Sequence, residues 1–474
     1  VSVNLAGTLD LFGKLSFIGS NRTFATAGNL IIKSTATGTG SVGDITNNGT
    51  NTGNTITGDV TVERFTTARR AWRLLSPPSQ HNLQTIKEAW QETQAPNATT
   101  PAGFGIQITS DRPSWSTDGF DLFTTAGASV KTYNPATNQW DGIISTVNVV
   151  TPTVSNGRFV TGKAYMTFIR GDRTINTFPA AATTSVLREK GALVTNNFVF
   201  PGGIGAGQFA AIGNPYASAV DFAKLTKTNL QNFYYLWDPQ LGTLGAYQTF
   251  TQVGPSYVAT PGGGSYSGSN SFIESGAAFF VRSSGPAGTL TFTENSKVDG
   301  SNLVTRAAGP ATYLRTNLYQ VINGNAVLFD GVLNQYDANF ENSMDDMDAL
   351  KLGNFGENLG IIAEGQTLAV ESRAGISGYD TIQYRIGQLR TQNYQFEFLP
   401  ENIDQYGVEA FLEDAFLQTR TPVSNTDTTR VNFTIINDAG SYAANRFRLV
   451  FRALAPVPVS FVDVRADKQG PDVK

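Results

Sequence analysis

Hydrophobic and polar residues alternate in short runs along most of this chain, and Gly, Pro and Asn interrupt the runs. Between residues 100 and 300 the runs include GFGIQIT, AYMTFIR, NFYYLW and GAAFFVR. A period of two residues is typical of strands, and frequent turn residues between short strands indicate a β-sandwich or jelly roll. The pattern therefore predicts an all-β fold with very little helix.

The first sixty residues have a pattern of their own. Gly7, Gly13 and Gly19 lie six residues apart, with short apolar runs between them. This spacing suits short stacked strands, either in a β-solenoid or in a tight antiparallel meander. Residues 38–58 are polar and rich in turn residues, so we expect a loop, resembling a linker, or a solenoid edge of low hydrophobicity.

Changes in pattern divide the chain into four expected parts. These are a glycine-punctuated region (1–60), two β-sandwich-like domains (61–305 and 310–455), and a linker with an isolated strand (456–474). The small residues at Arg306–Pro310 mark the junction of the two sandwiches. The isolated strand, Val459–Arg465, is either the first strand of a further domain or a strand offered to another chain. Short helices are expected at Asn82–Glu92, Asp221–Leu230 and Ala410–Leu417.

Composition excludes several classes of function. The 474 residues include no Cys and one His, His81, so thiol nucleophiles and Cys/His metal sites are excluded. The net charge is −4 and no dense run of Lys and Arg is present, so we expect no nucleic-acid partner. No stretch reaches the length of about 18 apolar residues that a transmembrane helix requires. Glycoside hydrolysis needs only two placed carboxylates, so it is the one enzyme class left open.

The densest charged feature is the segment YDANFENSMDDMDALKL. Several carboxylates in one loop suit Ca²⁺, which takes six to eight oxygen ligands, although the EF-hand pattern is absent. The alternative is a solvated acidic turn. The candidate ligands of a structural calcium ion are Asp337, Glu341, Asp345, Asp346 and Asp348.

Two aromatic segments are candidates for contact with sugars. Trp140 ends the segment YNPATNQW, and Tyr235 and Trp237 lie in YLWDP. Exposed aromatic rings stack on sugar faces, but aromatic residues on strands also pack in cores and hairpins. Both interpretations are open at this point.

The order of several segments resembles large surface proteins of Bacteroidota that the type IX secretion system exports. The segments are GDVTVERF, TARRAWRLLSPP, GNPYASAVDF, YYLWDPQLGTLGAYQTF, FIESGAAFFV and NRFRLVFRALAPVPVSFVDVRA. The resemblance implies a location outside a Gram-negative cell, with a sorting domain beyond the last strand. The chain begins at Val1 without an initiator Met or a leader, so we expect a mature chain after leader removal or an expressed segment. Thr381 and Thr428 follow Asp380 and Asp427 and resemble the Asp-Thr-X sites of O-glycosylation in Bacteroidota.

Two functions from different classes follow. The favoured one is a non-enzymatic structural or adhesive surface protein, without a cofactor other than the calcium ion considered above. Copies of the chain would associate into filaments or a surface layer when Val1–Leu11 of one copy meets Val459–Arg465 of another. The alternative is a glycan-binding adhesin or a carbohydrate-active accessory protein that uses exposed aromatic residues.

Overall fold

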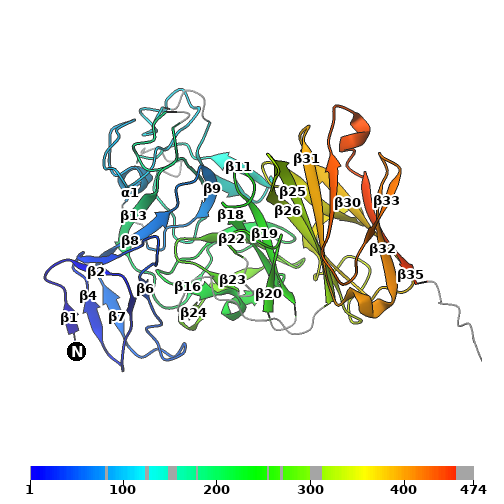
Figure 1. Cartoon of the computed structure of the whole chain (residues 1–474). Helices are drawn as coiled ribbons and strands as arrows, with labels where there is room; N and C mark the ends of the chain where they lie inside the picture. Colours follow the sequence, from blue (N-terminus) through cyan, green and yellow to red (C-terminus); the bar gives the residue numbers. More distant parts are fainter. Residues whose placement is uncertain are drawn as a thin grey trace, which may run out of the picture.

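The structure, a computed structural model, describes residues 2–80, 84–122, 127–147, 157–177, 180–253, 256–266, 271–298 and 312–454 (Figure 1). The described chain is built almost wholly of strands, with one short α-helix, α1 (Ile86–Trp90). The prediction of an all-β fold with very little helix is therefore confirmed. The predicted junction at 306–310, the strand at 459–465 and His81 lie outside the described residues.

The N-terminal part is a three-sided parallel β-solenoid. Its strands are β1 (Ser2–Asn4), β2 (Leu9–Leu11), β3 (Lys14–Leu15), β4 (Thr23–Ala25), β5 (Leu30–Ile32), β6 (Ser41–Val42), β7 (Thr55–Thr57) and β8 (Asp59–Thr66). All the pairs within these strands are parallel: β1-β4-β7 form one side, β2-β5-β8 the second and β3-β6 the third. Of the two predicted arrangements, the solenoid is confirmed and the antiparallel meander is wrong.

The glycine spacing marks the corners of one solenoid turn. Gly7 lies between β1 and β2, and Gly13 lies between β2 and β3, so the interval of six residues is one side and not one repeat. The polar stretch 38–58 contributes β6 and β7 to the solenoid wall, which corrects the comparison with a linker. Its Asn54 is buried, and the amide Nδ2 donates to the carbonyl oxygens of Gly19 at 2.9 Å and Ile45 at 3.0 Å.

The middle of the chain contains four small sheets, in the orders β11-β10-β12-β9, β15-β22-β18-β19-β20, β14-β23-β17 and β21-β16-β24. Its strands are β9 (Ala71–Leu75), β10 (Val130–Asn134), β11 (Gln139–Gly142), β12 (Tyr165–Ile169), β13 (Ser185–Ala192), β14 (Phe198–Val199), β15 (Phe209–Gly213), β16 (Ala219–Asp221), β17 (Thr226–Thr228), β18 (Phe233–Asp238), β19 (Ala246–Val253), β20 (Ser256–Thr260), β21 (Phe272–Ile273), β22 (Ala278–Arg282), β23 (Thr289–Phe292) and β24 (Lys297–Val298). The remaining strand, β13, pairs antiparallel with β8 and so joins this region to the solenoid. Strand β8 itself continues beyond residue 60, where the sequence predicts the end of the first part.

Both faces of the five-stranded sheet are buried. Tyr234 and Leu236 of β18 point to one core, and Phe233, Tyr235 and Trp237 point to another on the opposite face. The alternation of side chains along a strand produces this division. A sheet covered on both faces explains why its strands read as continuous apolar runs.

The C-terminal part is one sheet of eleven strands that surrounds a single core (Figure 1). Ten strands follow the order β33-β32-β35-β30-β28-β29-β26-β25-β31-β34, and β27 pairs with β29. The strands are β25 (Thr312–Ile322), β26 (Asn325–Tyr336), β27 (Ala349–Leu350), β28 (Asn358–Ala363), β29 (Gln366–Arg373), β30 (Tyr379–Gly387), β31 (Asn393–Glu401), β32 (Val408–Asp414), β33 (Thr419–Val423), β34 (Thr429–Thr434) and β35 (Phe447–Ala453).

This sheet packs against the middle region through a shared core. Leu333 and Val370 of the C-terminal sheet are fully buried in the same cluster as Tyr235 and Trp237. The Tyr235 hydroxyl donates to the Leu350 carbonyl oxygen at 2.7 Å. The two regions are therefore in firm contact across a buried apolar interface.

Two of the three helix predictions are wrong. Residues 221–230 contain a 3₁₀ turn, Phe222–Lys224, followed by β17. Residues 410–417 lie mostly in β32, which has neighbours on both sides and alternates between buried and more exposed positions. Pairing within the sheet overrides the helix propensity of EAFLEDAFL. The third prediction is consistent with α1, which Thr85 caps by accepting a hydrogen bond from the Glu88 amide.

Candidate functional site

The first turn of the solenoid, residues 2–18, is an open edge and is called the open rung below. Strand β1 is an end strand of its sheet and β2 is an end strand of the adjoining sheet, while β3 pairs with β6 alone. One side of each strand therefore lacks a paired strand among the described residues. Unpaired strand edges of this kind accept strands from other chains.

The exposure of stacked residues shows that the open rung has an apolar end. Leu9, Leu30 and Val60 occupy one column of the solenoid, and their exposures are 38%, 0% and 0%. In another column Val3 is 48% exposed, whereas Phe24 above it is 8% exposed. A further turn stacked on the open rung would bury these residues as the inner turns are buried.

Two more large apolar residues increase this surface, since Phe12 is 61% exposed and Ile18 is 90% exposed. Solenoids that remain monomeric close their ends with polar capping repeats. Natural sheet edges are protected by charged residues and Pro. The open rung contains two charged residues, Asp10 and Lys14, and no Pro. Its composition therefore favours association over protection.

Hydrogen bonds to the next turn fix the backbone of the open rung. The amide of Leu5 donates to the Ala25 carbonyl oxygen at 3.0 Å, and that of Leu9 donates to Asn29 at 2.9 Å. Gly40 packs so closely that a Cβ atom there would lie 2.1 Å from the Leu11 carbonyl oxygen. The edge is thus presented by ordered strands.

The five predicted calcium ligands do not converge in the structure. Among the described residues no group of three or more acidic side chains is placed to hold a metal ion. Asp348 accepts hydrogen bonds from the amides of Asp345 and Ser372, and Asp345 accepts one from Met347. Asp337 accepts one from Asn339, Glu341 accepts one from Ser343, and Asp346 accepts one from Gln231. Calcium binding thus stays a prediction from the sequence, without geometric support.

A carboxylate that the sequence did not single out, Glu371, lies buried near this acidic segment. Burial, together with the charges of Asp348 and Asp380, raises the pKa of Glu371 to about 7, while Arg373 and a hydrogen bond from Asn334 oppose the change. Because the folded state holds this proton more tightly than the unfolded state, the stabilisation from Glu371 is present at pH 4.5 and below. It is lost as the pH rises to about 7.

The substitution Glu371→Gln is therefore expected to stabilise the protein at pH 8 but not at pH 5. The neutral amide has no charge to bury, and the expected gain at pH 8 is about 2–3 kcal/mol. Urea unfolding of both proteins at the two pH values measures this gain. A difference between the proteins that is equal at pH 5 and pH 8 would contradict the assignment.

The predicted sugar contacts are wrong for two of the three aromatic residues. Tyr235 is fully buried and Trp237 is 3% exposed, so neither ring can reach a ligand on the surface. Trp140 is half-buried and lines a groove, and its ring meets Tyr133 at 5.5 Å between centroids. Of the predicted glycosylation sites, Thr428 is exposed in the β33–β34 loop and Thr381 is half-buried in β30. Both stay predictions.

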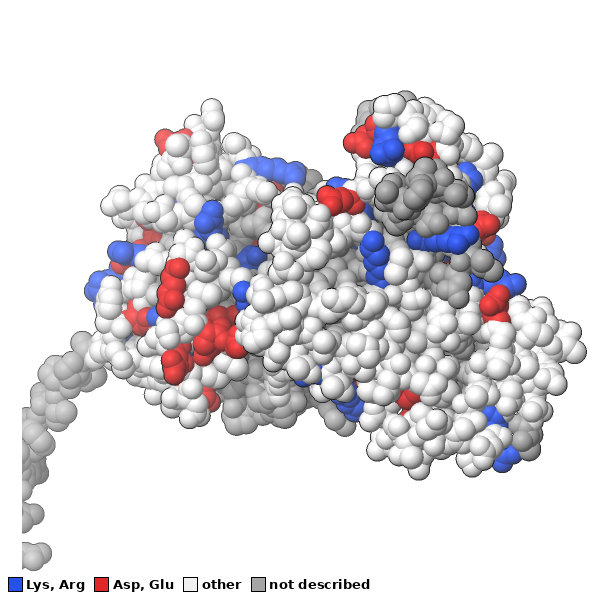
Figure 2. Space-filling model, turned by 180° about the vertical axis from the view of Figure 1, so that it is seen from behind, with Lys and Arg blue, Asp and Glu red and all other residues white. Residues whose placement is uncertain are grey.

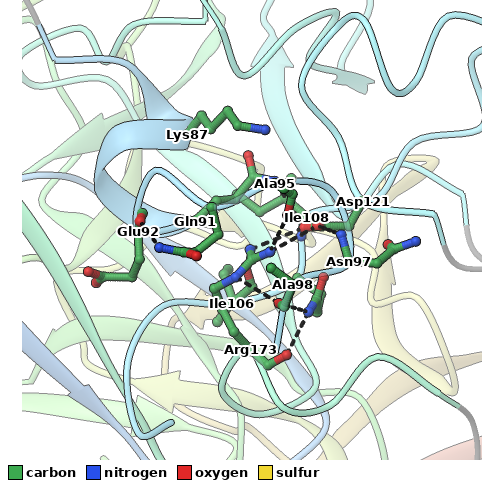
Figure 3. Close-up of polar contacts among 12 residues, drawn as sticks. Lys87, Gln91, Glu92, Ala95, Asn97, Ala98, Ile106, Ile108, Asp121 and Arg173 are labelled. Carbon is green, nitrogen blue, oxygen red and sulfur yellow. Dashed lines mark hydrogen bonds and ion pairs between the residues drawn. The ribbon is translucent and has the colours of Figure 1, made fainter. Parts of the chain in front are cut away.

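The most deeply buried ion pair joins Arg173 to Asp121 (Figure 3). Their side chains are 0% and 1% exposed, and the closest nitrogen and oxygen lie 3.1 Å apart. The guanidinium also donates to the carbonyl oxygens of Ala95, Ala98 and Ile106. The carboxylate accepts from Gln91 and from the amides of Asn97 and Ile108. The pair thus holds several loops together, and its role is structural.

Sequence reasoning did not identify this pair. The position of Asp121 between Phe120 and Leu122 was a signal of a carboxylate in apolar surroundings. Its partner, Arg173, is distant in the chain, so the sequence alone does not predict the pairing.

Comparisons with protein-family models, with curated proteins and with solved structures found no match to this chain. No helix among the described residues is long and apolar enough to cross a membrane.

Proposed function

We propose that this chain is a non-enzymatic structural protein of a cell surface and that its copies associate through the open rung. The observation that carries the proposal is the change in exposure along one column, from 0% at Leu30 to 38% at Leu9. An apolar end with free backbone edges is stabilised when another strand covers it.

A second copy of the chain is the proposed partner. If the segment 459–465 of one copy adds to the open rung of the next, the contact is head-to-tail and builds a filament. If two open rungs meet each other, the contact closes as a dimer. Location outside a Gram-negative cell and export by the type IX machinery are parts of the same proposal, and the resemblance of the sequence segments supports them.

The double substitution Val3→Lys and Leu9→Lys is expected to prevent association. Two ammonium groups on the edge must be desolvated when a strand covers them, which opposes contact. Removal of residues 1–11 is a weaker test because it would expose the next apolar turn, with Leu30 and Ile32, in place of the first. Light scattering on both proteins measures the mass of the assembly.

A matched control places the same two lysines elsewhere, in Leu417→Lys and Ile436→Lys. These side chains are 55% and 45% exposed in loops that follow β32 and β34, so their replacement leaves the open rung intact. The control is expected to associate as the wild type does. Equal association of the edge variant and the wild type would overturn the proposal.

A chain that ends at Leu454 distinguishes the head-to-tail contact from the contact between two open rungs. This chain stays monomeric if 459–465 supplies the strand, and it forms dimers if two open rungs meet.

Glycan binding is the second candidate function. It is favoured by one observation, the presence of Trp72 and Trp140 in the lining of a groove of about 900 Å³.

A further inference from the structure

A wide groove lies on the four-stranded sheet β11-β10-β12-β9, and none of the described residues that line it belongs to the open rung. Its volume of about 900 Å³ is at the upper end of the range for sites that hold small ligands. The residues that matter here are Arg70, Trp72, Lys131, Trp140, Phe168 and Arg170, all of which line it.

Two of these aromatic side chains share one face of the sheet. Trp72 of β9 and Phe168 of β12 are directly opposite each other in the antiparallel register. Arg70 directly precedes β9 and Arg170 directly follows β12, two residues from Trp72 and Phe168. Both arginines line the groove beside these rings.

Electrostatics and aromatic contacts support this placement. Burial and the charge of Arg70 lower the pKa of Arg170 to about 10, while Asp121 opposes the change. The Arg170 guanidinium lies 5.0 Å from the centre of the Phe168 ring, and Lys131 Nζ lies 5.1 Å from the centre of the Trp72 ring. Aromatic rings hold cations in position in this way.

The groove is cationic although the chain as a whole is acidic. Its charged lining residues are Arg70, Arg112, Lys131 and Arg170 against one carboxylate, Asp111, whereas the whole chain has a net charge of −4. Arg112 pairs with Asp118 at 3.0 Å. Among the described residues, Lys131 has no carboxylate within ion-pair distance. The excess of cationic over anionic side chains among the described lining residues therefore favours an anionic ligand.

Figure 2 shows the distribution of charged side chains on one face of the protein. The face seen from behind is mostly uncharged, and Asp and Glu gather in one patch on the C-terminal sheet. The floor of the groove is a sheet face, and not the free sheet edge at which peptides add as strands. The lining also offers the hydroxyls of Ser110, Ser129 and Thr243 as hydrogen-bond partners.

We propose that this groove binds a carboxylated polysaccharide, with Arg70, Arg170 and Lys131 contacting the carboxylates and Trp140 packing against a sugar ring. Guanidinium groups bind carboxylates through paired, charge-assisted hydrogen bonds. The inference concerns a surface other than the open rung, so it does not depend on association of the chain.

Calorimetric titration with a hexamer of galacturonic acid tests this proposal. Binding is expected for the wild type and is expected to weaken as salt is added. Maltohexaose, which has the same number of rings and no charge, is expected not to bind. The double substitution Arg70→Gln and Lys131→Gln is expected to weaken binding of the uronate by about tenfold or more. Arg448→Gln, at an exposed arginine on the C-terminal sheet, is the matched control and is expected to bind as the wild type does.

Other outcomes overturn the proposal. Absence of uronate binding, or equal binding by the double variant, excludes the groove as the site. Equal or tighter binding of hexaglutamate or of a six-residue thymidine oligonucleotide would assign the groove to an acidic peptide or to a nucleic acid instead. If the double variant fails to unfold cooperatively on heating, Lys131→Gln alone replaces it, because this half-buried side chain makes no ion pair among the described residues.

Discussion

Replacement of Asp121 with alanine is expected to lower the free energy of unfolding by about 3–5 kcal/mol. The substitution leaves the Arg173 guanidinium buried, at 0% exposure, without its counter-ion. It also removes the acceptor for the amides of Asn97 and Ile108 (Figure 3). Urea unfolding monitored by tryptophan fluorescence measures the loss.

The neighbouring pair of Asp118 with Arg112 provides the control. Its arginine is 44% exposed, so Asp118→Ala is expected to cost less than about 1 kcal/mol. Similar losses for the two substitutions would contradict the structural role assigned to the buried pair.

Replacement of Trp237 with alanine is expected to lower the free energy of unfolding by about 3–5 kcal/mol. The ring is 3% exposed and packs against Tyr247 and Phe355, with centroids 4.8 Å and 5.1 Å away. The substitution therefore opens a cavity in the core that joins the middle region to the C-terminal sheet. Thermal unfolding of the variant and the wild type measures the effect.

Trp140→Ala is the matched comparison because this ring is half-buried and lines the groove. A smaller loss of stability is expected there, together with weaker binding of the uronate hexamer. A Trp237→Ala protein of unchanged stability that fails to bind sugars would instead support the original prediction of a sugar contact at Trp237.

The all-β class could be predicted from alternation, but the partners of the strands could not. Leu9 stacks on Leu30, and Leu30 stacks on Val60. The residues around each position do not indicate that these strands pair in parallel. Solenoid and meander differ only in those distant pairings. The sequence alone therefore does not distinguish the solenoid from the meander.

Neighbouring strands also explain the wrong assignments. The segment at 410–417 has a composition that suits a helix, but β33 and β35 pair with both sides of it. Tyr235 and Trp237 belong to a sheet with two buried faces, and a run such as NFYYLW does not reveal the second layer. Exposure of an aromatic residue depends on what covers it, which is a property of the whole fold.

Part of the cationic groove could be predicted from the sequence. Arg70 and Trp72 are two residues apart, as are Phe168 and Arg170, and the period of a strand predicts that each pair lies on one face. What brings the two pairs together is the register of β9 with β12, which opposes Trp72 and Phe168. That register depends on hydrogen bonds between segments far apart in the chain.

Electron microscopy of the purified chain, in negative stain, tests whether copies associate through the open rung. We expect ordered assemblies in which neighbouring chains meet at the solenoid end that carries the open rung. The variant with Val3→Lys and Leu9→Lys is predicted to appear as separate particles under the same conditions. Separate particles for the wild type, or assemblies whose contacts leave the open rung uncovered, would rule out association through the open rung.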